Sequence, residues 1–137
     1  MKIQALALSL TLFSSVAFSS TLIDVIKIAG KNQSQVAEIL GKPSNCSKSK
    51  YGQKCSYSVA ETEIVFIKGK ADWITVEGID NVPFNRNALK SIGLSPTKPS
   101  FKNNFTLRWS SIQGLKQVSV FKGATNSDYA YIKAFTK

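Results

Sequence analysis

The stretch EIVFIKGKADWITVE, residues 63–77, constrains the fold more than any other part of this sequence. Two apolar runs, Ile64–Ile67 and Trp73–Val76, flank a short polar connection that contains Gly69. Runs rich in β-branched and aromatic residues on either side of a Gly-containing loop predict a β-hairpin. Because the first run is apolar on both faces of its strand, we place this hairpin in the middle of a sheet.

Shorter patterns on either side of the hairpin predict two short helices. Ser34–Leu40 begins with an N-cap serine and ends at Gly41 and Pro43, which stop a helix, and Phe84–Leu94 carries an apolar stripe. Thr21–Ala29 fits either a helix or a strand. Four further strands are expected over residues 56–60, 105–109, 117–121 and 129–135. The predicted fold class is α+β, with two short helices packed on an antiparallel sheet of about six strands.

Residues 20–137 have the length of a single compact domain. Its halves, residues 20–80 and 81–137, share one plan: a short helix, a Lys-Pro-Ser turn, a polar loop and three strands. The turns are Lys42-Pro43-Ser44 and Lys98-Pro99-Ser100. This plan favours a tandem repeat, although a helix followed by a meander is common enough to arise twice independently.

Residues 1–19 have the composition of a secretory signal peptide, with Lys2 followed by an apolar run and then by small residues. The apolar run is too short to span a bilayer comfortably, and no second apolar segment of spanning length follows. Cleavage is expected after Ala17 or Ser19. The sequence therefore predicts a bacterial protein that is periplasmic or secreted, without a transmembrane segment once the leader is removed.

The two cysteines, Cys46 and Cys55, agree with this destination. An even number of cysteines in an exported chain predicts a disulfide. The alternative is a metal site, but two thiols in a chain without histidine make a poor zinc site. We therefore expect a disulfide that closes a polar, lysine-rich loop.

The chain is strongly basic, with 18 Lys and Arg residues against 8 Asp and Glu. A basic surface favours acidic partners, which include acidic proteins, nucleic acid and anionic envelope polymers. Lysines that only solvate the sheet edges are the plainer explanation. The expected contacts are Lys48, Lys50 and Lys54 on the disulfide loop, Tyr51 as its apolar anchor, and Lys98, Lys102 and Arg108 in the second half.

Cations and aromatic side chains alternate along the second half, which is a pattern that single-stranded nucleic acids can exploit by stacking and charge. Phe105 and Trp109, however, share an inward register with Leu107 in the predicted strand, and such residues are more often part of the core. Binding of nucleic acid or of an anionic polymer through the basic second half is therefore kept as the alternative function.

Residues suited to catalysis are scarce in this sequence. The chain contains no histidine, which excludes Ser-His-Asp and Cys-His catalysis, and it lacks the Gly-rich phosphate-binding motifs. Glu61 and Glu63, two residues apart on one predicted strand face, could form the carboxylate pair of a small hydrolase. Charged residues at the start of an apolar strand explain them more simply. We expect neither an enzyme nor a cofactor or metal.

The run Ala37-Glu38-Ile39-Leu40-Gly41-Lys42-Pro43, together with the meander after it, resembles the SmpA/OmlA and β-lactamase-inhibitor-like (BLIP-like) superfamily of small exported domains. The resemblance covers mainly Ser34–Glu77 and extends to the second half only by plan. The chain lacks the lipid-attachment cysteine of the outer-membrane members. The resemblance implies a non-enzymatic role in binding a protein partner across a concave sheet face, as an inhibitor or an assembly factor. We therefore expect an exported binding protein that engages an acidic protein partner as an inhibitor, an immunity protein or an envelope assembly factor.

Overall fold

A computed structural model describes residues 20–136, so the predicted signal peptide over residues 1–19 lies outside the described residues. The helices are α1 (Val25–Ile28), α2 (Gln33–Leu40) and α3 (Ala88–Ser91), with a 3-10 turn, η1, at Val59–Glu61. The strands are β1 (Asn45–Lys48), β2 (Gln53–Tyr57), β3 (Thr62–Ile67), β4 (Lys70–Val76), β5 (Phe101–Lys102), β6 (Thr106–Ile112), β7 (Leu115–Lys122) and β8 (Ser127–Lys133).

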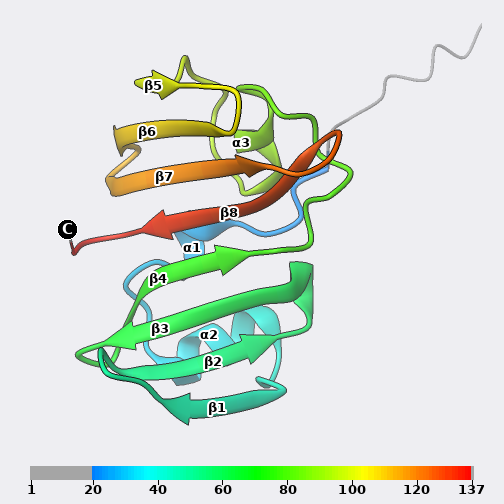
Figure 1. The fold of residues 1–137 in the computed structure, drawn as a ribbon. Helices are drawn as coiled ribbons and strands as arrows, with labels where there is room; N and C mark the ends of the chain where they lie inside the picture. The colour runs from blue at the N-terminus through cyan, green and yellow to red at the C-terminus, as the bar shows by residue number, and fades with distance from the viewer. Residues whose placement is uncertain (1–19, 137) are drawn as a thin grey trace, which may run out of the picture.

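All the strands form one antiparallel sheet in the order β1-β2-β3-β4-β8-β7-β6-β5. Each half of the chain contributes a four-stranded meander, and the last strands of the two meanders, β4 and β8, pair with each other. Figure 1 shows the helices gathered behind this sheet, with α2 behind β2 and β3 and α3 behind β6 and β7. None of the helices formed by residues 20–136 has the length and apolar content that crossing a bilayer requires.

The predicted α+β class is confirmed, but the sheet has eight strands rather than about six. The hairpin of residues 63–77 becomes β3 and β4 in the interior of the sheet, as predicted. The strands that were missed are β1 and β5, which form its two edges. Both are short, and β1 is polar apart from Cys46, as edge strands commonly are. Such strands carry no hydrophobic pattern.

The helix boundaries also differ from the predictions. Asn32, not Ser34, caps α2: its Oδ1 accepts a hydrogen bond from the backbone N–H of Gln35, whose side chain accepts one from the N–H of Asn32. This reciprocal pair is a capping box. The second predicted helix is reduced to α3, and the segment of undecided structure, Thr21–Ala29, contains the short helix α1.

The core lies between the helices and the face of the sheet that they cover. Its strand residues alternate with residues of the opposite face, and fully buried Val36 and Leu89 contribute from α2 and α3. Large strand side chains that are fully buried include Ile64, Phe66, Ile74, Val76, Leu107 and Ile132. This burial assigns every second strand residue to the covered face and leaves the others on the opposite face.

The predicted disulfide is present and joins Cys46 of β1 to Cys55 of β2. The two residues are paired across the strands, so the segment predicted as a loop is a cross-linked hairpin. Cys55 is completely buried, and the bond therefore attaches the outer strand β1 to the core.

Replacing both cysteines by alanine should lower the free energy of unfolding by about 2–3 kcal/mol, because the unfolded chain regains the entropy of a short closed loop. Urea unfolding of the double variant beside the oxidised protein measures this loss. The reduced wild-type protein is the matched control and should show a similar decrease. Equal stability of all three forms would contradict the assigned contribution.

Candidate functional site

The face of the sheet opposite the helices is turned toward the viewer in Figure 1, with no helix in front of it. Cross-strand partners share a face of the sheet, so the strand register defines which side chains lie there. One row across the sheet runs Lys54, Val65, Trp73, Lys133, Gln117 and Ser110. The next row runs Ser56, Glu63, Thr75, Tyr131, Ser119, Arg108 and Phe101.

Several aromatic side chains lie on this face among polar residues. Trp73 of β4 lies near the middle, and its ring contacts the ring of Tyr51 from the β1–β2 turn, with centroids 4.7 Å apart. On the other half, Phe121 and Tyr129 stack with their centroids 4.6 Å apart. Tyr51 is 55% exposed, whereas Trp73 is half-buried among its neighbours. The rings therefore have fixed positions and still present surface to solvent.

Cations lie against several of these rings. The Nζ of Lys50 is 5.5 Å from the centroid of its neighbour Tyr51, and the guanidinium of Arg108 is 5.2 Å from that of Phe101. Cations at such distances from a ring are attracted to its face. We call this surface the aromatic–basic face and define it by Tyr51, Trp73, Phe101, Phe121, Tyr129 and Tyr131 with Lys50, Lys54, Arg108 and Lys133.

Tyr131 occupies the row that crosses from one half of the chain to the other, opposite Thr75 of β4 and Ser119 of β7. Burial raises the pKa of its phenol above the usual value, and the charge of Asp72 raises it further. Both effects disfavour the charged phenolate. The hydroxyl therefore remains a neutral hydrogen-bond donor at physiological pH.

The structure divides the contacts that the sequence predicted. Tyr51, Lys54 and Arg108 belong to the aromatic–basic face, together with Lys50. Lys48 pairs with Gln53 and Lys102 pairs with Leu107, so the register places both on the helix side of the sheet. Lys98, in the connector before β5, lies beside Lys102 in a cavity on that side. The predicted cations thus form two separate groups.

Trp73 and Lys133 are not among the contacts predicted from the sequence, and the predicted strand alternation assigns Phe105 to the core. Phe105 is 71% exposed. The Oδ1 of Asn103 accepts hydrogen bonds from the N–H groups of Phe105 and Thr106, which forms a turn immediately before β6. β6 begins only at Thr106, so the alternation that buries Leu107 and Trp109, as predicted, does not continue back to Phe105.

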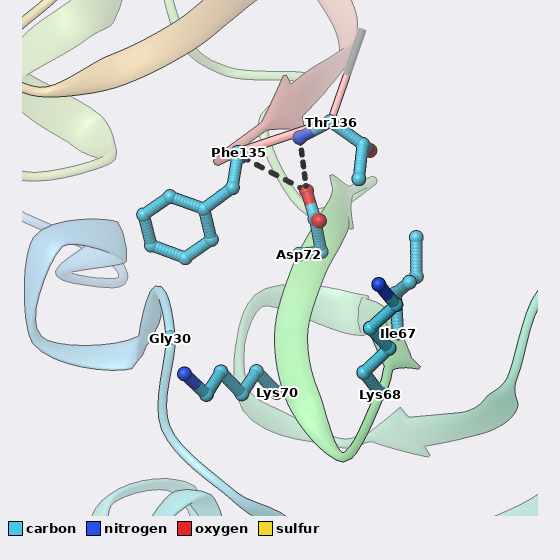
Figure 2. A pocket seen from close by; sticks show the side chains of 7 residues that line it. All are labelled: Gly30, Ile67, Lys68, Lys70, Asp72, Phe135 and Thr136. Carbon is cyan, nitrogen blue, oxygen red and sulfur yellow. Dashed lines mark hydrogen bonds between the residues drawn. The ribbon is translucent and has the colours of Figure 1, made fainter.

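A cavity of about 490 Å³ lies beside Trp73, at the tip of the β3–β4 hairpin. Figure 2 shows its lining residues: Gly30, Ile67, Lys68, Lys70, Asp72, Phe135 and Thr136. The Oδ1 of Asp72 accepts hydrogen bonds from the N–H groups of Phe135 and Thr136, at 3.0 and 3.3 Å. The Nε1 of Trp73 donates to the Oγ1 of Thr136 at 2.7 Å. These contacts attach the segment after β8 to the aromatic–basic face.

The predicted carboxylate pair lines another cavity, of about 400 Å³, together with Glu77. Glu61 ends η1 and has a left-handed backbone conformation with φ of 48°, whereas Glu63 lies within β3. The prediction that both glutamates project from one regular strand is therefore wrong, because the strand begins after Glu61.

Comparisons of the chain with protein-family models, with curated proteins and with solved structures gave no match.

Proposed function

We propose that this protein is an exported, non-enzymatic binding protein that holds an acidic protein partner on its aromatic–basic face. Inhibition, immunity or envelope assembly would be the purpose of such binding. The observation that carries the proposal is the set of aromatic rings and adjoining cations on the face of the sheet that no helix covers.

The chemistry of this face suits a protein interface. Tyr, Trp and Arg are the residues most enriched among those that dominate binding energy, and all three occur here. The contact of Tyr51 with Trp73 and that of Arg108 with Phe101 position these side chains before a partner arrives. Such preorganisation lowers the entropy cost of binding.

Charge favours an acidic partner over a neutral one. The protein carries a formal net charge of +10, and Lys54, Arg108 and Lys133 all lie on the aromatic–basic face. Carboxylates of a partner would form charge-assisted hydrogen bonds with them, and the overall charge would accelerate the encounter.

Export is supported by the Cys46–Cys55 disulfide, because such bonds persist in oxidising compartments. The leader-like composition of residues 1–19 and the resemblance of Ser34–Glu77 to small exported inhibitor-like domains support the same view. The proposed location is the periplasm or the medium of a bacterium.

The decisive experiment identifies a partner and then tests the face. Immobilised wild-type protein is incubated with envelope extract, and a captured acidic protein is purified for affinity measurement. Trp73→Ala should weaken its binding roughly 30-fold, because aromatic residues at the centre of an interface typically contribute about 2 kcal/mol. Phe105→Ala is the matched control, since Phe105 is exposed but lies outside the face, and it should leave the affinity unchanged. Equal affinities for all three proteins would overturn the proposal.

The alternative function is binding of nucleic acid or of an anionic polymer. One observation favours it: Trp73, Phe121 and Tyr131 form a sheet surface with Arg108 and Lys133 between and beside them, which resembles a stacking platform for bases. A fluorescent oligothymidylate distinguishes the two functions. Affinity for the oligonucleotide that falls steeply with salt and is lost in Trp73→Ala would support binding of an anionic polymer. Absence of any affinity for the oligonucleotide would support the protein partner.

A further inference from the structure

A cavity of about 340 Å³ opens on the helix side of the sheet, beside the edge strand β5. It is lined by Asn85, Arg86, Lys98, Pro99, Lys102 and Leu107. Lys102 pairs with Leu107, whose side chain belongs to the core, whereas the adjacent pair Phe101 and Arg108 belongs to the opposite face. This basic cavity is therefore separate from the aromatic–basic face.

One wall of the basic cavity is the connector before β5, which several hydrogen bonds attach to β6. The Nε1 of Trp109 donates to the carbonyl oxygen of Thr97 at 2.8 Å, and the N–H of Ser100 donates to the carbonyl oxygen of Arg108 at 2.8 Å. Lys98 lies between these two attachments, in a segment that prolines stiffen further. The backbone of the wall is thus fixed, although the lysine side chains remain exposed.

The facing wall is the turn before α3. The Oδ1 of Asn85 accepts a hydrogen bond from the N–H of Asn87 at 2.8 Å, and the N–H of Asn85 donates to the carbonyl oxygen of Pro83. This bond orients the side chain of Asn85, and its amide nitrogen, which is the donor of the group, can then donate to a ligand. Arg86 follows directly and adds a guanidinium to the same wall.

The lining of the basic cavity contains three cations and no carboxylate. Like charges that face one cavity repel each other, and a bound anion would remove this repulsion. Arg offers a planar fork of donors that matches the oxygens of a phosphate group, and Lys contributes a mobile point charge. The apolar surfaces of Pro99 and Leu107 could contact the carbon part of such a ligand.

We propose that the basic cavity binds the phosphate group of a phosphate ester through Arg86, Lys98 and Lys102, with Asn85 as an additional donor. Its volume is in the range of small-molecule sites. The ester is either a soluble molecule or the headgroup of a phospholipid, and the same donors would recognise both. This site is independent of the partner proposed for the aromatic–basic face.

Titration with glycerol phosphate and with inorganic phosphate, followed by backbone amide NMR, tests the site in the intact protein. Amide resonances of residues 85–86, 98 and 100–102 should shift and reach a plateau as the ligand saturates the site. The triple variant Arg86→Gln, Lys98→Gln and Lys102→Gln should bind at least tenfold more weakly. The control replaces three exposed lysines, Lys27, Lys42 and Lys116, by glutamine, which gives the same change in net charge and should leave the affinity unchanged.

Vesicles distinguish the two sources of the phosphate. Binding to phosphatidylglycerol vesicles, but not to phosphatidylcholine vesicles, that is lost only in the triple variant would assign a lipid headgroup. Binding of glycerol phosphate without vesicle binding would assign a soluble ester. The proposal is overturned if neither glycerol phosphate nor phosphatidylglycerol vesicles bind. It is also overturned if the control variant loses binding as strongly as the triple variant.

Discussion

Replacing Ile132 by alanine should lower the free energy of unfolding by about 3–5 kcal/mol, the upper part of the range for buried aliphatic residues. Ile132 lies in β8, is completely buried, and pairs with Ile74 of β4 on one side and Val118 of β7 on the other. It therefore contacts strands from both halves of the chain at the position where they join. The cavity that alanine leaves has rigid sheet backbone around it and cannot easily collapse.

Urea unfolding followed by tryptophan fluorescence measures this loss and also reports on the halves separately. Trp73 lies in β4 and Trp109 in β6. The single variant Trp109→Phe therefore reports on the first half of the chain, and the single variant Trp73→Phe reports on the second. We expect coincident transitions from both reporters, because a shared core and the β4–β8 pairing make unfolding cooperative. Lys133→Ala, one residue away on the opposite face, is the control and should change stability by less than about 1 kcal/mol. Two separate transitions would contradict the cooperative assembly.

The interior of the fold could be predicted because its signals are local. Residues 63–77 combine β-branched runs with a Gly-containing turn, and each of these features acts within a few residues. The edge strands could not be predicted in this way. Asn45–Lys48 is a strand because the disulfide and the pairing with β2 hold it there, and neither contribution appears in its own hydrophobicity. Phe101–Lys102 depends in the same way on its pairing with β6.

The candidate site shows the same division. The constrained cysteine loop indicated Tyr51 and its neighbouring lysines as candidate contacts. The place of Trp73 on the aromatic–basic face depends instead on residues that are distant in sequence. Its ring meets Tyr51, and its strand pairs with β8, which brings Lys133 beside it. Alternation within a strand places Tyr129 and Tyr131 on one face, but only the pairing of β4 with β8 shows which residues of the first half lie next to them.

The pairing of β4 with β8, the last strands of the two meanders, also bears on the predicted tandem repeat. In each half a helix precedes a four-stranded meander, and the meanders meet antiparallel at β4 and β8. Two related units joined through equivalent strands would produce this order. The tandem repeat remains a prediction. This sheet order has one functional consequence. The aromatic–basic face combines Trp73 from the first half with Tyr131 from the second.

Asp72→Ala should lower the free energy of unfolding by about 3–4 kcal/mol, although the residue belongs to a hairpin near the surface. Val65 pairs with Trp73 and Phe66 pairs with Ala71, so Asp72 is the extra residue of a β-bulge. The bulge turns its carboxylate toward the segment after β8, where Oδ1 accepts hydrogen bonds from Phe135 and Thr136. Asp72 is only 3% exposed, and alanine would leave these two donors without their partner.

Asp72→Asn tests whether the acceptor or the charge provides this stabilisation. An asparagine Oδ1 can still accept both hydrogen bonds, but bonds to a neutral amide are weaker than those to a carboxylate. We therefore expect a loss of about 1–2 kcal/mol for asparagine, clearly smaller than the loss for alanine. Asp80→Ala, which removes an exposed carboxylate, should have almost no effect.

Hydrogen exchange locates the effect of the Asp72 variants within the chain. The amides of Phe135 and Thr136 should exchange much faster in Asp72→Ala than in the wild-type protein, while amides in the middle of β7 change only through the lower global stability. The indole N–H of Trp73 should exchange faster as well. It donates to Thr136, and this hydrogen bond to the aromatic–basic face would be lost when Thr136 detaches. Unchanged exchange at Phe135 and Thr136 would show that the carboxylate does not hold this segment, and the stability loss would then require another cause.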